Sequence, residues 1–285
     1  MNEARTLHSY EPGRPHWWQW LTVLSLDAPL VAVVWQLALA QVAGVTLRAH
    51  HTFILGAAVW LAYAVDRWIE GWRISPDLVR TQRHWFYQYW RWPMAILWML
   101  VLVAALVLSF TLLSCEELRT GLLLLGPVLV YLLSHQFIHR DRRWRAPKEI
   151  CVAALFTIGV ASFPVANHPA ALAGLAPALA FFGLLCFADC ALISLWEDEV
   201  DRMHGQTSLA LQFPRGRVVV RGLPWGIAVL GAAVAWREQS WLAACAAGSG
   251  VLLGSLDLFH RRLGRQLSRA LVDVTLMTPA VFLFS

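Results

Sequence analysis

Two short acidic stretches of this chain combine residue types and spacing that could bind a metal ion. Asp66 and Glu70 lie four residues apart in one stretch, and Glu197 and Asp201 lie four residues apart in the other. Residues at this spacing share one face of a helix, so each stretch can present two carboxylates to one ligand. Both stretches follow apolar segments, and charged groups at membrane depth are usually paired, metal-bound or functional because burying them is costly. We therefore interpret the two stretches as halves of one site.

Four carboxylates without a softer ligand suit Mg²⁺, a hard ion that takes oxygen ligands and is usually completed by water and substrate phosphates. Nearby basic residues could neutralise phosphate oxygens, and Lys148 among them is the only lysine in the chain. Such groups above an apolar cavity predict a site for an amphiphilic diphosphate. The expected chemistry is ionisation, in which metal and cations stabilise departing pyrophosphate and an allylic carbocation remains. The basic residues are Arg67, Arg73, Arg145, Lys148 and Arg202.

The composition indicates an integral membrane protein. The chain of 285 residues is 58% hydrophobic and only 14% charged, whereas soluble domains average about 25% charged residues. The net charge of +5 fits basic loops at a membrane surface better than a nucleic-acid partner. Residues 1–19 are polar, so we expect no cleavable signal peptide. The five cysteines are scattered, which indicates neither a disulfide framework nor a zinc site.

Nine segments are long and apolar enough to cross a bilayer, which takes about 20 residues at a rise of about 1.5 Å each. They predict an all-α, polytopic membrane protein with nine transmembrane helices around a central cavity. We expect a cytoplasmic N-terminal segment over residues 1–19 and one transmembrane domain over residues 20–285. The nine segments are about 20–42, 51–69, 93–113, 118–138, 150–166, 170–195, 218–235, 241–257 and 267–284.

The basic residues predict how the helices are oriented. If the N-terminus and the loops after the second, fourth, sixth and eighth helices share one side, that side holds 20 of the 23 lysines and arginines. The positive-inside rule then places the N-terminus in the cytoplasm and the C-terminus outside the cell membrane. Both acidic stretches fall at cytoplasmic ends, those of the second and sixth helices.

Here the residues resemble a known family. The first acidic stretch reads Asp-x-x-x-Glu from residue 66, and the second reads Glu-x-x-x-Asp-Arg-x-x-Gly-x-x-Ser-Leu from residue 197. Together with the nine-helix layout, these stretches resemble the UbiA superfamily of intramembrane prenyltransferases, and the second is the more specific of the two. The resemblance implies a helical bundle around a central cavity, two Mg²⁺ ions, and transfer of a prenyl group from a polyprenyl diphosphate to an acceptor.

The resemblance also implies roles for individual residues. The metal-bridging acids would be Asp66, Glu70, Glu197 and Asp201. Arg202 and Lys148 would contact the diphosphate, and we expect the same of Arg67 and Arg145 from their place in the cytoplasmic loops.

The chain departs from the family pattern at several positions. Ala62 stands where the first motif usually begins with Asn, and Glu70 and Glu197 stand where the family has Asp. The second motif opens with Ile193-Ser194 in place of Asn-Asp, and Gln206 replaces the usual Lys. The Lys-Arg pair of the fourth loop has its counterpart in His139-Arg140 or is lost. These departures indicate a divergent branch with an altered substrate.

The sequence alone leaves several interpretations open, both for individual residues and for the function. Asp27, Asp189 and Asp273 lie inside apolar spans and either line the cavity, as Tyr63 would, or bond a neighbouring helix. Trp68 and Trp72 either stabilise a carbocation or belong to an interfacial belt. The acceptor could be aromatic or lipid-like. The alternatives to a transferase are a terpene cyclase on the same scaffold and a non-catalytic membrane protein that binds a prenyl diphosphate.

Overall fold

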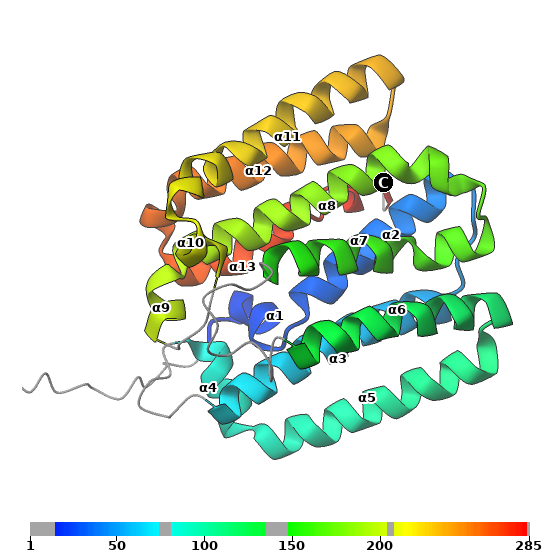
Figure 1. The fold of residues 1–285 in the computed structure, drawn as a ribbon, viewed down its shortest axis with the longest axis horizontal. Coiled ribbons are helices and arrows are strands. Elements are labelled where there is room, and N and C mark those ends of the chain that lie inside the picture. Colours follow the sequence, from blue (N-terminus) through cyan, green and yellow to red (C-terminus); the bar gives the residue numbers. More distant parts are fainter. Residues whose placement is uncertain (1–14, 74–80, 135–147, 204–207, 284–285) are drawn as a thin grey trace, which may run out of the picture.

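The computed structural model describes residues 15–73, 81–134, 148–203 and 208–283, and every regular element among them is a helix (Figure 1). Six of these helices are long and apolar enough to cross a membrane. Each coincides with one of the nine expected segments, and the chain is therefore an integral membrane protein. The six are α3 (Ala49–Arg73), α5 (Arg91–Leu112), α7 (Lys148–Asn167), α8 (Ala171–Trp196), α11 (Arg217–Glu238) and α12 (Trp241–Leu263).

The first expected span, residues 20–42, is a bent pair of helices. The short helices η1 (Trp17–Gln19) and α1 (Trp20–Val23) meet α2 (Asp27–Ala43) at 80°. Pro29 favours this break, because in a regular helix its ring would clash with the carbonyl of Ser25, four residues earlier. Proline alone does not enforce a break, since Pro127, Pro164, Pro177 and Pro224 lie inside continuous helices. Ser25 has a left-handed φ of 56°. The Trp60 ring nitrogen donates to the Leu24 carbonyl at 2.9 Å. The Tyr87 hydroxyl donates to Ser25 Oγ at 3.2 Å. Both bonds hold the bend in place.

The last expected span, residues 267–284, is also interrupted. It consists of α13 (Arg265–Thr275) and the single turn α14 (Ala280–Leu283). Pro279 accounts for the break, since its ring would clash with the Thr275 carbonyl if the helix continued. Both proline breaks leave a helix shorter than a bilayer crossing needs, so the number of nine spans stays a prediction.

The fourth expected span corresponds to α6 (Cys115–Leu133), and residues 135–138 of that expectation lie outside the described residues. The helix begins three residues before the expected start because Ser114 caps it. Ser114 Oγ accepts from the backbone N–H of Glu117, and the Glu117 carboxylate accepts from the backbone N–H of Ser114. This reciprocal capping box satisfies backbone donors that the first helical turn leaves free.

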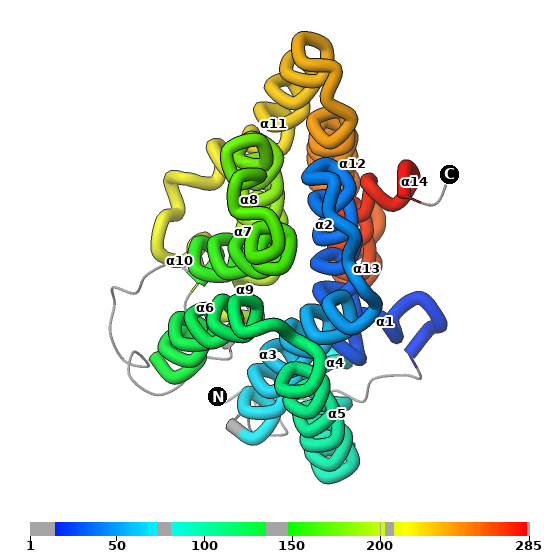
Figure 2. The backbone as a smooth tube through the Cα atoms, turned by 90° about the vertical axis from the view of Figure 1, so that its right-hand side faces the viewer, coloured from blue at the N-terminus to red at the C-terminus, as the bar shows by residue number. Residues whose placement is uncertain are grey.

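The long helices run side by side as an elongated bundle. Figure 2, which looks along them, places α11 and α12 at one extreme and α5 at the other, with the remaining helices between. The main core lies between α2, α7, α8, α12 and α13, where Trp35 stacks on Phe182 with a centroid distance of 4.7 Å. A smaller core joins α3, α5 and α4 (Gln82–Tyr89) around the buried side chains of Trp60 and Tyr87.

Short helices cover the end of the bundle at which α3 and α8 terminate (Figure 1). They are α1, α4, α9 (Asp198–Met203), α10 (Leu209–Gln212) and the 3₁₀ turn η4 (Pro214–Gly216). Thr81 caps α4 by accepting from the backbone N–H of His84. The expected spans include none of α4, α9 and α10, yet these helices carry or approach most of the predicted site residues.

Glycine residues let α11 and α12 pack closely. A Cβ added to Gly250 of α12 would lie 2.6 Å from the Pro224 carbonyl oxygen and 2.8 Å from the Ala228 nitrogen of α11. Those are backbone atoms that cannot move aside like the tip of a flexible side chain. Small residues at such crossings are the usual means by which membrane helices approach one another.

We predict that Gly250→Ala destabilises the protein by about 1–3 kcal/mol, because the added methyl group overpacks the α11–α12 contact. The matched control is Gly226→Ala in α11, where a Cβ meets nothing within 4 Å. That change should be neutral or slightly stabilising, since alanine favours a helix over glycine by about 1 kcal/mol. Thermal unfolding of both variants in detergent measures the difference, and equal melting temperatures would contradict the prediction.

Candidate active site

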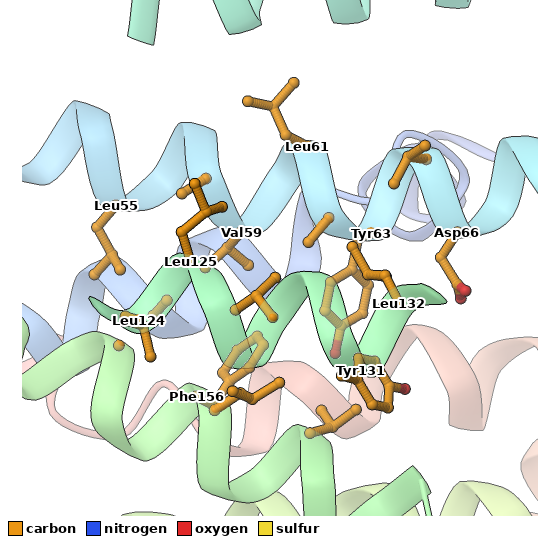
Figure 3. Close-up of a pocket in the computed structure, with 18 of the residues that line it drawn as sticks. Leu55, Val59, Leu61, Tyr63, Asp66, Leu124, Leu125, Tyr131, Leu132 and Phe156 are labelled. Carbon is orange, nitrogen blue, oxygen red and sulfur yellow. The ribbon is translucent and has the colours of Figure 1, made fainter. Parts of the chain in front are cut away.

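A cavity of about 850 Å³ lies among α3, α5, α6, α7 and α8. This volume falls within the range of about 300–1,000 Å³ typical of ligand pockets. Figure 3 shows how its character changes along α3. Leu55 and Val59 lie toward one end, Asp66 lies at the other, and Tyr63 and Tyr131 lie between them. The cavity is therefore apolar along most of its length and charged at one end.

All four predicted carboxylates line the charged end of this cavity. Asp66 and Glu70 project from the last turns of α3, while Glu197 directly follows α8 and Asp201 lies in α9. The backbone N–H of Asp201 donates to the Glu197 carbonyl at 2.8 Å, so the two acids stay one helical turn apart across the junction between α8 and α9. The two acidic stretches, about 130 residues apart in sequence, thus meet in one site as expected.

Glu70 has two partners among the residues that the structure describes. Its Oε2 accepts from the Arg67 guanidinium at 3.1 Å and from His84 Nε2 at 2.8 Å. Burial lowers the pKa of His84 to about 4, although Glu70 opposes this shift. The imidazole is therefore neutral near pH 7, with its proton on Nε2 to satisfy the carboxylate. Its Nδ1 then accepts from the Thr81 hydroxyl at 2.6 Å. The N-terminal turn of α4 is in this way bonded to the end of α3.

Glu197 is bound to the same helix. Its Oε2 accepts from the Arg83 guanidinium at 2.9 Å, and both side chains are buried. Burial raises the pKa of Glu197, but Arg83, and beyond it Arg269 and Arg67, outweigh burial and lower the pKa to about 2. Glu197 therefore stays ionised, and α4 joins the two acidic stretches through the adjacent residues Arg83 and His84.

Asp201 has a different environment. Burial raises its pKa, while the positive charge of Lys148 opposes that shift. Lys148 begins α7 and lines the cavity. The adjacent Glu149 is almost fully buried, and its Oε1 accepts from the backbone N–H of Leu209 at 2.9 Å. The start of α7 is thereby tied to the chain that follows the second acidic stretch.

The predicted basic residues are placed unevenly. Arg67 and Lys148 line the cavity. Arg202 has a side chain 65% exposed and lies 3.8 Å from Asp198, outside the cavity lining. Arg145 lies outside the described residues. Two arginines that the sequence singled out only for topology, Arg83 and Arg269, do line the cavity. No spacing rule distinguishes them from the other loop arginines, so only the fold reveals them.

A second polar cluster lies deeper in the cavity. Asp189, Asp273 and Tyr63 line it, as one of the two sequence readings expected. Asp27 is buried beside them, and Arg269 forms ion pairs with both Asp273 and Asp27. Trp68 and Trp72 do not belong to the cavity lining. Trp68 instead donates to the Arg91 carbonyl at 3.0 Å, and Trp72 is half exposed, which favours the interfacial reading for both.

The donor set of the charged end suits a hard divalent cation, since it consists of carboxylate oxygens. Within the described part of the chain, however, no three His, Cys, Asp or Glu side chains are close enough together to hold a metal ion. Glu70 instead contacts Arg67 and His84, and Glu197 contacts Arg83 of α4. The residues therefore fit Mg²⁺ in chemistry, provided that the two glutamates exchange these partners for the metal.

Comparison with known proteins adds one finding. No family model and no curated protein matches the chain. Among solved structures, the chain is similar to the apo structure of a UbiA homolog from Aeropyrum pernix, with a TM-score of 0.58. The identity is 13%, and the alignment covers 91% of this chain and 99% of the other. At this identity the similarity concerns the fold, and it confirms the UbiA-like helical fold that the two motifs indicated.

We predict that Arg83→Gln makes the protein less stable near pH 7 and that this difference narrows on acidification. The pKa of Glu197 is lowered from 4.5 to about 2 in the fold. Its ionised form therefore stabilises the fold above about pH 4.5, by up to about 3 kcal/mol, and this contribution is lost as the pH falls toward 2. Removing Arg83 removes most of this contribution.

Chemical unfolding in detergent with EDTA, at several pH values between about 7 and 3, measures this dependence. Arg202→Gln is the control, because its exposed side chain should leave the stability nearly unchanged. A difference between Arg83→Gln and wild type that stays constant with pH would show that Arg83 acts through packing alone.

Proposed function

We propose that this protein is a membrane-embedded prenyltransferase that moves a prenyl group from a polyprenyl diphosphate to an aromatic or lipid-like acceptor, with Mg²⁺ as cofactor. The observation that carries the proposal is the polarity of the cavity. The four acids of the two sequence motifs line one end together with Arg67 and Lys148, and aliphatic side chains of α3, α5, α6 and α7 line the rest. An isoprenoid diphosphate has the same division into a charged head and an apolar chain.

The charge balance at the cavity favours a ligand that binds together with a cation. Among the described lining residues, seven acids face four bases. An excess of buried carboxylates is costly unless protons or cations offset it. The acids are Asp66, Glu70, Glu149, Asp189, Glu197, Asp201 and Asp273, and the bases are Arg67, Arg83, Lys148 and Arg269.

In this proposal, the residues that line the cavity have three different roles. Asp66, Glu70, Glu197 and Asp201 hold the magnesium, and this cofactor supplies charge neutralisation to the departing pyrophosphate. Arg67 and Lys148 donate hydrogen bonds to phosphate oxygens, which stabilises the charge that develops on the leaving group. The aliphatic walls exclude water, so that the allylic cation is protected from hydrolysis.

Two tyrosines are placed to stabilise that cation. Tyr63 and Tyr131 line the cavity between the acids and the aliphatic end (Figure 3). Phe156 packs edge to face against Tyr63 with a centroid distance of 5.8 Å. Aromatic faces attract cations by about 1–2 kcal/mol when desolvated. The rings of Tyr63 and Tyr131, rather than those of Trp68 and Trp72, therefore stabilise the carbocation.

The number and the orientation of the membrane spans are part of the same proposal. The six clear spans, the bent first span, α6, and the interrupted helices α13 and α14 would together make nine crossings, of which α11 and α12 do not line the cavity. By the positive-inside rule, we assign the charged end, and the N-terminus, to the cytoplasm of a cell-membrane protein. The diphosphate then enters from the cytoplasmic side.

We predict that the detergent-purified protein releases pyrophosphate from geranyl, farnesyl or geranylgeranyl diphosphate in the presence of Mg²⁺ and not in EDTA. Asp201→Asn and Asp66→Asn should each lower the rate by roughly 100-fold or more, because each removes a charge that holds the metal at the leaving group. Asp198→Asn is the matched control, since Asp198 belongs to the same acidic run but pairs with Arg217 outside the cavity lining.

The outcomes separate the candidate functions. Release that requires Mg²⁺ and Asp201 supports ionisation, and the products formed without an acceptor then distinguish a transferase from a cyclase. Binding of the diphosphate without release supports a non-catalytic binding protein. Equal activity of Asp201→Asn and Asp198→Asn would refute the assigned site.

We also predict that Lys148→Ala weakens binding of farnesyl diphosphate by about 10- to 100-fold, as expected for loss of a charged hydrogen bond in a buried site. Arg202→Ala should weaken it by less than about threefold, because that side chain is exposed and outside the cavity lining. Equilibrium binding in Mg²⁺ measures both constants. A larger effect of Arg202→Ala would mean that Arg202 turns toward the bound diphosphate.

A further inference from the structure

Asp189 has an unused hydrogen-bonding atom in the cavity. The residue lies in α8, eight positions before Glu197 and thus about 12 Å along the helix axis. Its side chain is 5% exposed and lines the cavity. Its Oδ1 has no hydrogen-bond partner among the residues that the structure describes. Buried polar atoms are nearly always bonded, so an unpaired carboxylate oxygen at a cavity wall indicates a group that a ligand satisfies.

The surroundings of Asp189 determine the chemistry of that ligand. Asp27, Asp273 and Arg269 are its charged neighbours. The guanidinium of Arg269 is already committed to Asp273 and Asp27. Three carboxylates therefore share one cation, and Asp27 Oδ2 likewise lacks a hydrogen-bond partner within the described part of the chain. Such a cluster accepts hydrogen bonds and repels anions.

The position of the cluster relates it to the proposed reaction. A diphosphate bound through the magnesium at Glu197 and Asp201 would extend its first isoprene units toward Asp189, since both acids lie just beyond the C-terminal end of α8 and Asp189 lies earlier in this helix. Tyr63 lines the cavity and has Asp273 and Asp27 among its charged neighbours. Along α3 it lies close to Asp66 (Figure 3). A second molecule held at Asp189 therefore lies beside the reacting end of the prenyl chain.

We propose that Asp189, supported by Asp273 and Arg269, is the binding subsite for the acceptor and selects an acceptor with a hydroxyl or amine that donates a hydrogen bond, not one with a carboxylate at that position. This assignment rests on the proposed prenyl transfer, which requires an acceptor in the same cavity. The Asp189 carboxyl group forms the hydrogen bond, while the Arg269 ion pairs fix the neighbouring carboxylates. An acid would add a further carboxylate beside Arg269, whose guanidinium is already paired with Asp273 and Asp27, so like-charge repulsion disfavours it.

Three phenols of similar size test the proposal by calorimetry on the full-length protein in detergent. They are tyramine, which carries an ammonium group, 4-ethylphenol, which is neutral, and 4-hydroxyphenylacetate, which carries a carboxylate. Wild-type protein should bind the first two at least about tenfold more tightly than the third. Asp189→Asn keeps the shape of the side chain and should bring the three affinities within about threefold of one another. Asp198→Asn, outside the cavity lining, should retain the wild-type order.

Equal affinities for the three phenols in wild type, tightest binding of the carboxylate, or no binding of tyramine and 4-ethylphenol would each overturn the subsite. So would an unchanged order in Asp189→Asn. Farnesyl diphosphate is titrated into the wild-type protein in parallel, with Mg²⁺ or EDTA. If the phenols bind as expected but the diphosphate does not, the subsite stands and the prenyl transfer fails. If the diphosphate binds and the phenol order is absent, the subsite alone fails.

Discussion

The ion pair of Glu197 with Arg83 and the hydrogen bond of Glu70 with His84 are the contacts with α4 on which the charged end of the cavity depends. The Glu197 side chain is 8% exposed and that of Glu70 is 15% exposed, and an isolated ion buried to this extent would cost several kcal/mol. Arg83 pairs with Glu197, and His84 and Arg67 bond Glu70. Since α4 carries two of these partners on adjacent residues, it fastens the end of α3 to the end of α8. The cavity is closed there by paired charges and not by apolar packing.

This arrangement gives a physical account of the departures from the family motifs. The two positions at which glutamate replaces the usual aspartate are the two acids that contact α4. The additional methylene group moves each carboxylate further from its helix, toward Arg83 and His84. Asp66 and Asp201 keep the shorter side chain, and the positive charge of Lys148 opposes the effect of burial on the pKa of Asp201. The altered motif and the charged face of α4 are thus two parts of one network.

Two helix breaks place the deeper polar cluster. Pro29 ends any continuous helix before α2, which leaves Asp27 at the first turn of α2, and Pro279 shortens the last span to α13, which carries Arg269 and Asp273. Arg269 then joins these two helices through its carboxylate partners. The same cation therefore stabilises an irregular part of the bundle, and among the residues that the structure describes Asp189 of α8 has no ion pair of its own.

The sequence by itself determined the fold class, the position of most apolar helices and the four carboxylates, because apolar length and the i, i+4 spacing are local properties of the chain. It also indicated the UbiA-like fold through the second motif. The apolar composition of the segments did not predict the interruptions near Pro29 and Pro279, because an average over a segment does not report the steric effect of one proline ring. Only the tertiary structure decided which bases face the acids. Arg83 and Arg269 enter the cavity while Arg202 points outward, and pairing between elements far apart in the chain depends on packing that no local pattern encodes.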